Sequence, residues 1–164
     1  MRCKLTGESG VVSPIGYLTS MGIIFEVHKH QPIRSKQDTL ALVRFPIERS
    51  IKTLAFSTPD GTLLLVAFPG IERLDYGRLA KALHIKRSGL RPADTAQLLM
   101  LGMEPGGVTP ISAAGNATMV FDSQVPEMGH VYCGGGTPDQ TLRLHVKDII
   151  QLASKTVVAS IVAS

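Results

Sequence analysis

Two apolar runs in the middle of the chain are separated by a short turn sequence. Residues 51–57 read IKTLAFS, residues 62–68 read TLLLVAF, and TPDG lies between them. Apolar runs of this length, bounded by turn residues, are typical of strands, and Asp60-Gly61 tolerates the positive φ that a tight turn requires. The pattern therefore predicts a β-hairpin.

A lysine interrupts the first of these runs. In an extended strand, alternation places Lys52 on the same face as Leu54 and Phe56. A lysine on an apolar face either extends its ammonium group to water or lies at a cavity where its charge meets an anion. The sequence alone leaves both interpretations open.

The rest of the chain alternates short helical and extended patterns. Ser13-Pro14 and Asp75 supply helix-capping signals, and residues 104–116 are rich in Gly and Pro and are expected to form a loop. The C-terminal TVVASIVA is expected to be a strand or a packed tail. Helices are predicted over 14–21, 36–43, 75–84, 93–101 and 147–153, and further strands over 23–29, 118–122, 130–133 and 141–145. This order predicts an α+β fold: a single compact domain, 1–164, with a mixed, largely antiparallel sheet and surrounding helices.

Composition is consistent with one domain and indicates a cytoplasmic setting. The chain has 164 residues, of which 44% are apolar, enough for one sizeable core. No secretory signal is recognised, and the longest apolar runs fall short of the roughly 20 residues of a membrane span. Cys3 and Cys133 are far apart and form no zinc or disulfide pattern. We therefore expect the protein to work in the reducing cytoplasm. We expect no membrane association, no metal and no cofactor.

The basic residues are unevenly distributed. Eleven of the 17 Lys and Arg residues lie between Arg34 and Arg91, whereas residues 104–142 contain neither. Clustered cations are typical of a surface that binds a polyanion such as nucleic acid. The alternative is an ordinary solvated face.

Two glycine-rich segments are candidates for chemistry. EPGGVTP (104–110) and CGGG (133–136) could expose backbone amides to a carboxylate, phosphate or oxyanion, although paired glycines are more commonly simple turns. Cys133 could be a nucleophile, but no partner base is evident. His28 and His30 are a weak metal signal, and polar positions near a strand end are the alternative. Motifs for nucleotide triphosphate or dinucleotide binding, zinc proteases and serine hydrolases are absent from the sequence.

Five segments together resemble a known family in order and spacing. The segments are HQPIRS (30–35), IERSIKTLAF (47–56), VAFPGIERLDYGRLAKAL (66–83), GMEPGGVTPI (102–111) and VYCGGGTPDQTLRLHVKDIIQL (131–152). Through them the chain resembles, over roughly residues 23–153, the YbaK/ProX-type aminoacyl-tRNA deacylases, a superfamily that also occurs as the editing insertion of bacterial prolyl-tRNA synthetases.

The resemblance implies roles for individual residues. Lys52 corresponds to the key lysine of the family's Lys-Thr-Leu strand, and Gly106 and Gly107 correspond to the loop that holds the aminoacyl group, so these three are expected to be catalytic. The residues expected to bind substrate are Val108, His30, Arg34, Gly134 and Gly135.

The resemblance also implies a function. The chain would be a trans-editing hydrolase that deacylates mischarged tRNA carrying a small amino acid of the Ala, Cys, Ser or Thr class. Its partner would be aminoacyl-tRNA, with an aminoacyl-tRNA synthetase as a further candidate, and it would be a monomer or homodimer. The alternatives are a non-catalytic module that binds a tRNA acceptor or a protein, and a deacylase for another acyl conjugate.

Overall fold

The computed structural model describes residues 12–32, 46–115 and 117–163, and its strands form two sheets. One sheet has the order β1-β7-β6 and is antiparallel; the other has the order β4-β2-β3-β5-β8, in which β3, β5 and β8 are parallel and the rest antiparallel. The strands are β1 (Glu26–Lys29), β2 (Ile51–Ser57), β3 (Leu63–Pro69), β4 (Arg91–Pro92), β5 (Ala117–Asp122), β6 (His130–Gly134), β7 (Gln140–His145) and β8 (Thr156–Ala159). The α+β class is confirmed, but the strands divide into two sheets, which an isolated bridge between Ser50 and Tyr132 connects.

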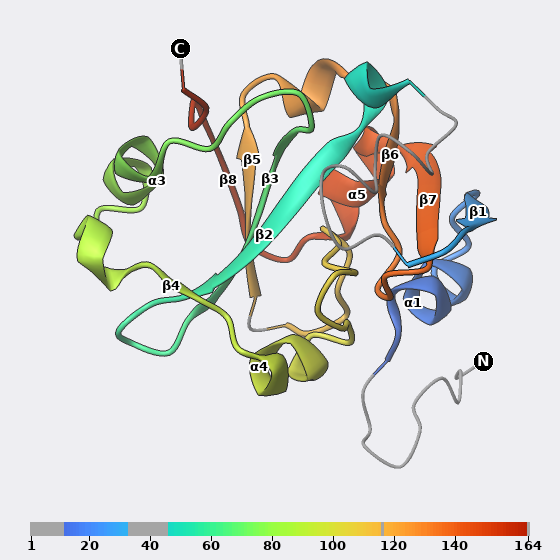
Figure 1. Ribbon diagram of the computed structural model, residues 1–164, viewed down its shortest axis with the longest axis horizontal. Coiled ribbons are helices and arrows are strands. Elements are labelled where there is room, and N and C mark those ends of the chain that lie inside the picture. The colour runs from blue at the N-terminus through green and yellow to red at the C-terminus, as the bar shows by residue number, and fades with distance from the viewer. Residues whose placement is uncertain (1–11, 33–45, 116, 164) are drawn as a thin grey trace.

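The helices are short and lie around the sheets (Figure 1). They are α1 (Pro14–Ser20), α3 (Tyr76–Ala82), α4 (Thr95–Met100) and α5 (Val146–Leu152), with 3-10 turns η1 (Ile47–Arg49), η2 (Arg87–Gly89) and η3 (Val125–Glu127). Side chains cap their first turns as the sequence predicts: Ser13 accepts from the amide of Gly16 at 3.0 Å, and Asp75 from that of Arg78 at 3.0 Å. The helix predicted over 36–43 lies outside the described residues.

The predicted hairpin is present. β2 and β3 pair antiparallel from Ile51 opposite Pro69 to Ser57 opposite Leu63. Gly61 has a φ of +85° in the turn, as expected. Hydrogen bonds from the Thr58 hydroxyl and the Thr62 amide stabilise the Asp60 carboxylate in this turn and lower its pKa.

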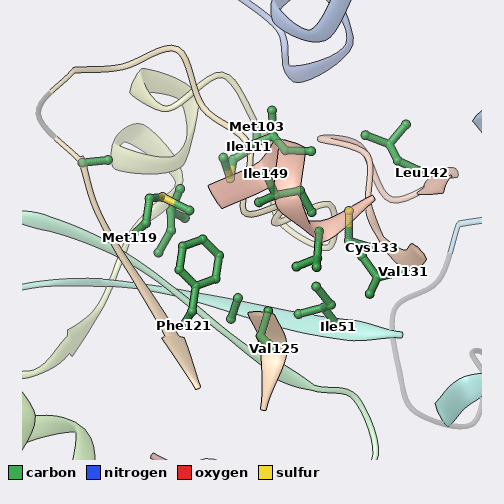
Figure 2. Close-up of a cluster of buried hydrophobic side chains, with 14 of the residues drawn as sticks. Ile51, Met103, Ile111, Met119, Phe121, Val125, Val131, Cys133, Leu142 and Ile149 are labelled. Carbon is green, nitrogen blue, oxygen red and sulfur yellow. The ribbon is translucent and has the colours of Figure 1, made fainter. Parts of the chain in front are cut away.

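Two apolar clusters cover the two faces of the larger sheet. The first lies between the two sheets and includes residues from α5; Figure 2 shows Phe121, Cys133 and Ile149 gathered in it. The second lies on the opposite face and includes Phe68 of β3 and Leu79 of α3. Because both of its faces are covered, every residue of β3 is buried.

One strand begins three residues later than predicted, and one short strand lies outside the predicted elements. The strand expected over 23–29 begins only at Glu26, because the chain first closes α1: Gly22 has a φ of +72°, and the Ile23 amide donates to the Leu18 carbonyl at 3.1 Å. The two-residue strand β4 was not predicted. The C-terminal segment proves to be both a strand and a packed tail, since β8 is followed by the buried Ile161.

Asp122 holds this tail in place, and its replacement by alanine is expected to destabilise the protein. The buried carboxylate accepts hydrogen bonds from the Ile161 amide at 2.9 Å and from the Gln124 amide at 3.0 Å. Asp122→Ala leaves these donors without a partner, so the free energy of unfolding should fall by about 3 kcal/mol, measured by urea denaturation. Asp122→Asn keeps an acceptor and should cost less. Equal stability of the alanine variant and the wild type would contradict this role.

Candidate functional site

The first glycine-rich segment forms a tight turn. Glu104, Pro105, Gly106 and Gly107 adopt a turn in which the Gly107 amide donates to the Glu104 carbonyl at 2.9 Å and Gly106 has a φ of +84°. Proline followed by a glycine of positive φ is typical of a type II turn. The two consecutive amides therefore do not both point to a ligand, because that of Gly107 is already used. The amides of Gly106 and Val108 have no hydrogen-bond partner among the described residues.

The turn is docked onto the second glycine-rich segment. The Glu104 amide donates to the Gly136 carbonyl at 2.8 Å, and the Gly136 amide donates to the Gly107 carbonyl at 2.9 Å. A Cβ atom at Gly107 would overlap the backbone of Gly136 and Thr137. These two segments are therefore brought together by backbone contact that leaves no space for a side chain.

Gly134 makes the second close approach. A Cβ atom added there would overlap the Val108 carbonyl oxygen, so Val108 lies directly against the end of β6. Gly135 has a different role: its amide donates to the Gln140 carbonyl at 3.2 Å, and its carbonyl accepts from the Gln140 side chain at 2.9 Å. Gly135 thus shapes the turn between β6 and β7.

His30 joins the site through a residue that the sequence analysis missed. Thr141 lies directly opposite Gly134 in the β6–β7 pair, and its Oγ1 lies 2.8 Å from His30 Nε2. His30 Nδ1 lies 2.7 Å from the Gln31 carbonyl, which can only accept, so the neutral ring carries its proton on Nδ1 and accepts from Thr141 on Nε2. The two histidines that formed the weak metal signal make different contacts. The exposed His28 lies 3.0 Å from the Glu26 carboxylate, whereas His30 contacts Thr141.

A carboxylate beside His30 was also missed. The Asp139 carbonyl accepts from the His30 amide at 2.9 Å, and the Thr137 hydroxyl donates to the Asp139 carboxylate at 2.6 Å. This hydrogen bond lowers the pKa of Asp139, so its carboxylate stays anionic at neutral pH. No local sequence pattern indicates that Thr141 and Asp139 lie beside His30, because this arrangement depends on the pairing of β6 with β7 that places Thr141 opposite Gly134.

Lys52 lies at the surface of β2. It is directly opposite Phe68, so it shares the face of the second apolar cluster, as alternation predicts. Its side chain is exposed and makes no hydrogen bond or ion pair with the described residues. The parallel bridge between Ser50 and Tyr132 lies two residues before both Lys52 and Gly134, so the start of β2 lies beside the middle of β6 (Figure 1). Arg34, the remaining predicted site residue, lies outside the described residues.

The aminoacyl-tRNA editing domain family matches residues 30–152, which include every predicted site residue. The chain belongs to this family. Among solved structures, it is similar to the hypothetical protein APE2540, with a TM-score of 0.73 and 23% identity over 90% of this chain and 97% of that one. It is also similar to "a putative trans-editing enzyme for prolyl tRNA synthetase", with a TM-score of 0.69 and 24% identity over 85% and 87% of the two chains. These structures share the fold. A comparison with curated proteins finds no match.

The described cations of this editing domain's basic segment lie in two places, whereas Arg34, Lys36 and Arg44 lie outside the described residues. Six of its exposed cations lie on or beside α3, η2 and β4, whereas Arg49 and Lys52 lie at the start of β2. Figure 1 shows α3 on the opposite side of the molecule from β6 and β7. The six are Arg73, Arg78, Lys81, Lys86, Arg87 and Arg91.

In the described part of this editing domain, no group of three or more His, Cys, Asp or Glu residues could hold a metal ion. None of the described helices is long and apolar enough to cross a membrane.

Cys133 of this editing domain is expected to be unreactive in the folded state. Burial raises the pKa of its thiol to about 12, and the neighbouring Thr109 hydroxyl offsets only part of this shift. The nucleophilic thiolate is therefore absent at neutral pH. In a Cys3→Ser variant, whose only thiol is that of Cys133, Ellman's reagent should label Cys133 only as fast as the protein unfolds. Rapid labelling under native conditions would contradict this expectation, and labelling in urea is the control.

Proposed function

We propose that this editing domain hydrolyses, in trans, the ester between tRNA and a small amino acid of the Ala, Cys, Ser or Thr class. The observation that carries the proposal is the docking of the Gly106–Val108 turn onto Gly134, beside His30, within the region that matches the family. We further propose a cytoplasmic setting, which the buried free thiol of Cys133 supports.

The proposed reaction needs no protein nucleophile. Water attacks the ester carbonyl, the bond between that carbon and the ribose oxygen breaks, and the proton released by the water passes to the ribose oxygen, which leaves as a hydroxyl group. Where the substrate's own hydroxyl or thiol attacks instead, its proton passes to the ribose oxygen in the same way, and water then opens the resulting lactone or thiolactone to the free amino acid. The oxyanion that forms is stabilised by Lys52 and by the amides of Gly106 and Val108, which lack partners among the described residues. One such donor typically lowers the barrier by about 3 kcal/mol. Gly107 contributes by allowing the close approach of the turn.

Substrate binding is proposed to use the surroundings of the turn. Val108, Gly134 and His30 would form the wall of a small pocket, Gly135 would hold its shape, and Arg34 would border it. The anionic Asp139 beside His30 suits the α-ammonium group of an aminoacyl ester. Small substrates would be selected by size, because a pocket that admits small residues excludes larger cognate ones.

The test is hydrolysis of a panel of mischarged tRNAs that carry Ala, Cys, Ser and Thr. Release of one of these amino acids, faster than spontaneous hydrolysis and dependent on the protein concentration, is expected. Absence of turnover on the whole panel, with tRNA binding retained, would overturn the hydrolase proposal. It would favour the alternative, a non-catalytic module that binds the tRNA acceptor.

A further inference from the structure

A basic hollow lies next to the proposed ester site. It has a volume of about 480 Å³, and its polar lining side chains are Arg49, His130, Tyr132 and Arg143. The charged side chains among the described residues that line it are all basic. Such a hollow suits an anion, and two guanidinium groups favour an oxyanion with several acceptor oxygens, such as a phosphodiester.

The hollow and Gly134, against which the Gly106–Val108 turn is docked, share one face of the smaller sheet. Tyr132 pairs with Arg143, and Gly134 pairs with Thr141, so the two pairs are two residues apart and point the same way. The intervening Cys133 faces the apolar cluster on the other side. At about 3.3 Å per residue, the two pairs lie about 7 Å apart along the strands. A ligand that has its reacting ester at Gly134 would carry its neighbouring groups along this face.

The two arginines are held in place without using all their donors. Arg49 donates to the Met128 carbonyl at 2.9 Å, and Arg143 lies 3.5 Å from the Glu26 carboxylate, with its guanidinium 5.9 Å from the centre of the Tyr132 ring. A guanidinium carries five N–H donors, so each retains several for a ligand. Glu26 offsets part of the charge of Arg143, whereas Arg49 has no carboxylate partner among the described residues.

We infer that this hollow binds a phosphodiester of the single-stranded 3′ end of tRNA, about one nucleotide away from the aminoacyl ester. The inference rests on the proposed function, because that function places the terminal ribose at the Gly106–Val108 turn. The basic residues around α3 lie on the opposite side of the molecule, so they are poorly placed for this part of the RNA (Figure 1).

The test is binding of a fluorescein-labelled, uncharged RNA hairpin with a single-stranded CCA 3′ end, measured by anisotropy across a series of salt concentrations. Arg49→Gln and Arg143→Gln should each raise the Kd about fivefold to tenfold and reduce the salt slope by about 0.7 for each phosphate that the variant no longer neutralises. Arg49→Lys and Arg143→Lys keep the charge and should retain most of the slope. Arg91→Gln, an exposed arginine of β4, is the matched control and should change neither quantity.

Several outcomes would overturn the inference. The first is a loss of affinity with Arg91→Gln as large as that with Arg49→Gln or Arg143→Gln. The second is the same effect of Arg49→Gln and Arg143→Gln on binding of a blunt hairpin that lacks the single-stranded end. The third is displacement of the labelled RNA by free inorganic phosphate as effectively as by the unlabelled hairpin. Thermal unfolding checks that Arg49→Gln is folded, and Arg143→Gln tests the same hollow without disturbing the hydrogen bond to Met128.

Binding of uncharged RNA does not depend on turnover, so the two proposals can fail separately. Arginine-dependent binding without any hydrolysis would refute the hydrolase alone. Hydrolysis with arginine-independent binding would refute the phosphodiester site alone.

Discussion

Lys52→Ala should slow hydrolysis of the substrate identified in the panel by about 100- to 1,000-fold, as expected for the loss of one oxyanion donor. The Lys52 side chain is exposed and has no partner among the described residues, so its truncation should leave the free energy of unfolding almost unchanged. The decrease in rate would then reflect the chemical step and not a loss of folded protein. The measurement is the single-turnover rate of hydrolysis of aminoacyl-tRNA, together with urea denaturation of the same samples.

Two further variants sharpen this experiment. Lys52→Arg keeps the charge but changes its shape and reach, so it should recover only part of the rate. Lys155→Ala removes another exposed lysine, which precedes β8 at the edge of the larger sheet, separated from β2 by β3 and β5, and this variant should match the wild type. A Lys52→Ala protein with the full wild-type rate would show that the oxyanion is stabilised elsewhere.

Gly107→Ala should reduce both the stability of the protein and its rate of hydrolysis. The added methyl group would overlap the backbone of Gly136 and Thr137, neither of which can rotate away as a side chain could. The turn must then move, and the backbone hydrogen bonds that join Glu104 and Gly107 to Gly136 would break. Overpacking of this kind costs about 1–3 kcal/mol, which urea denaturation would detect.

A matched glycine provides the control for this variant. A Cβ atom at Gly115 would meet nothing, so Gly115→Ala should change the free energy of unfolding by less than about 0.5 kcal/mol and leave hydrolysis unaffected. If Gly107→Ala were as stable and as active as Gly115→Ala, the close docking of the turn would be irrelevant to the site.

Local features of the fold could be predicted because neighbouring residues determine them. The β2–β3 hairpin follows from two apolar runs and a Pro-Asp-Gly turn, and the start of α1 follows from Ser13 and Pro14. The type II turn at Gly106 has a similarly local cause, since proline followed by glycine favours it. The division into two sheets could not be predicted, because it depends on pairings between strands far apart in sequence, such as β1 with β7.

The sequence by itself determined the α+β class, the face of β2 on which Lys52 lies, and the resemblance to tRNA-editing deacylases. The tertiary structure alone decided that Val108 rests on Gly134 and that His30 meets Thr141. It also separated the basic residues into two groups and placed two arginines in one hollow. The physical reason is that alternation and capping act within a few residues, whereas close backbone approach and shared cavities arise only when distant segments pack together.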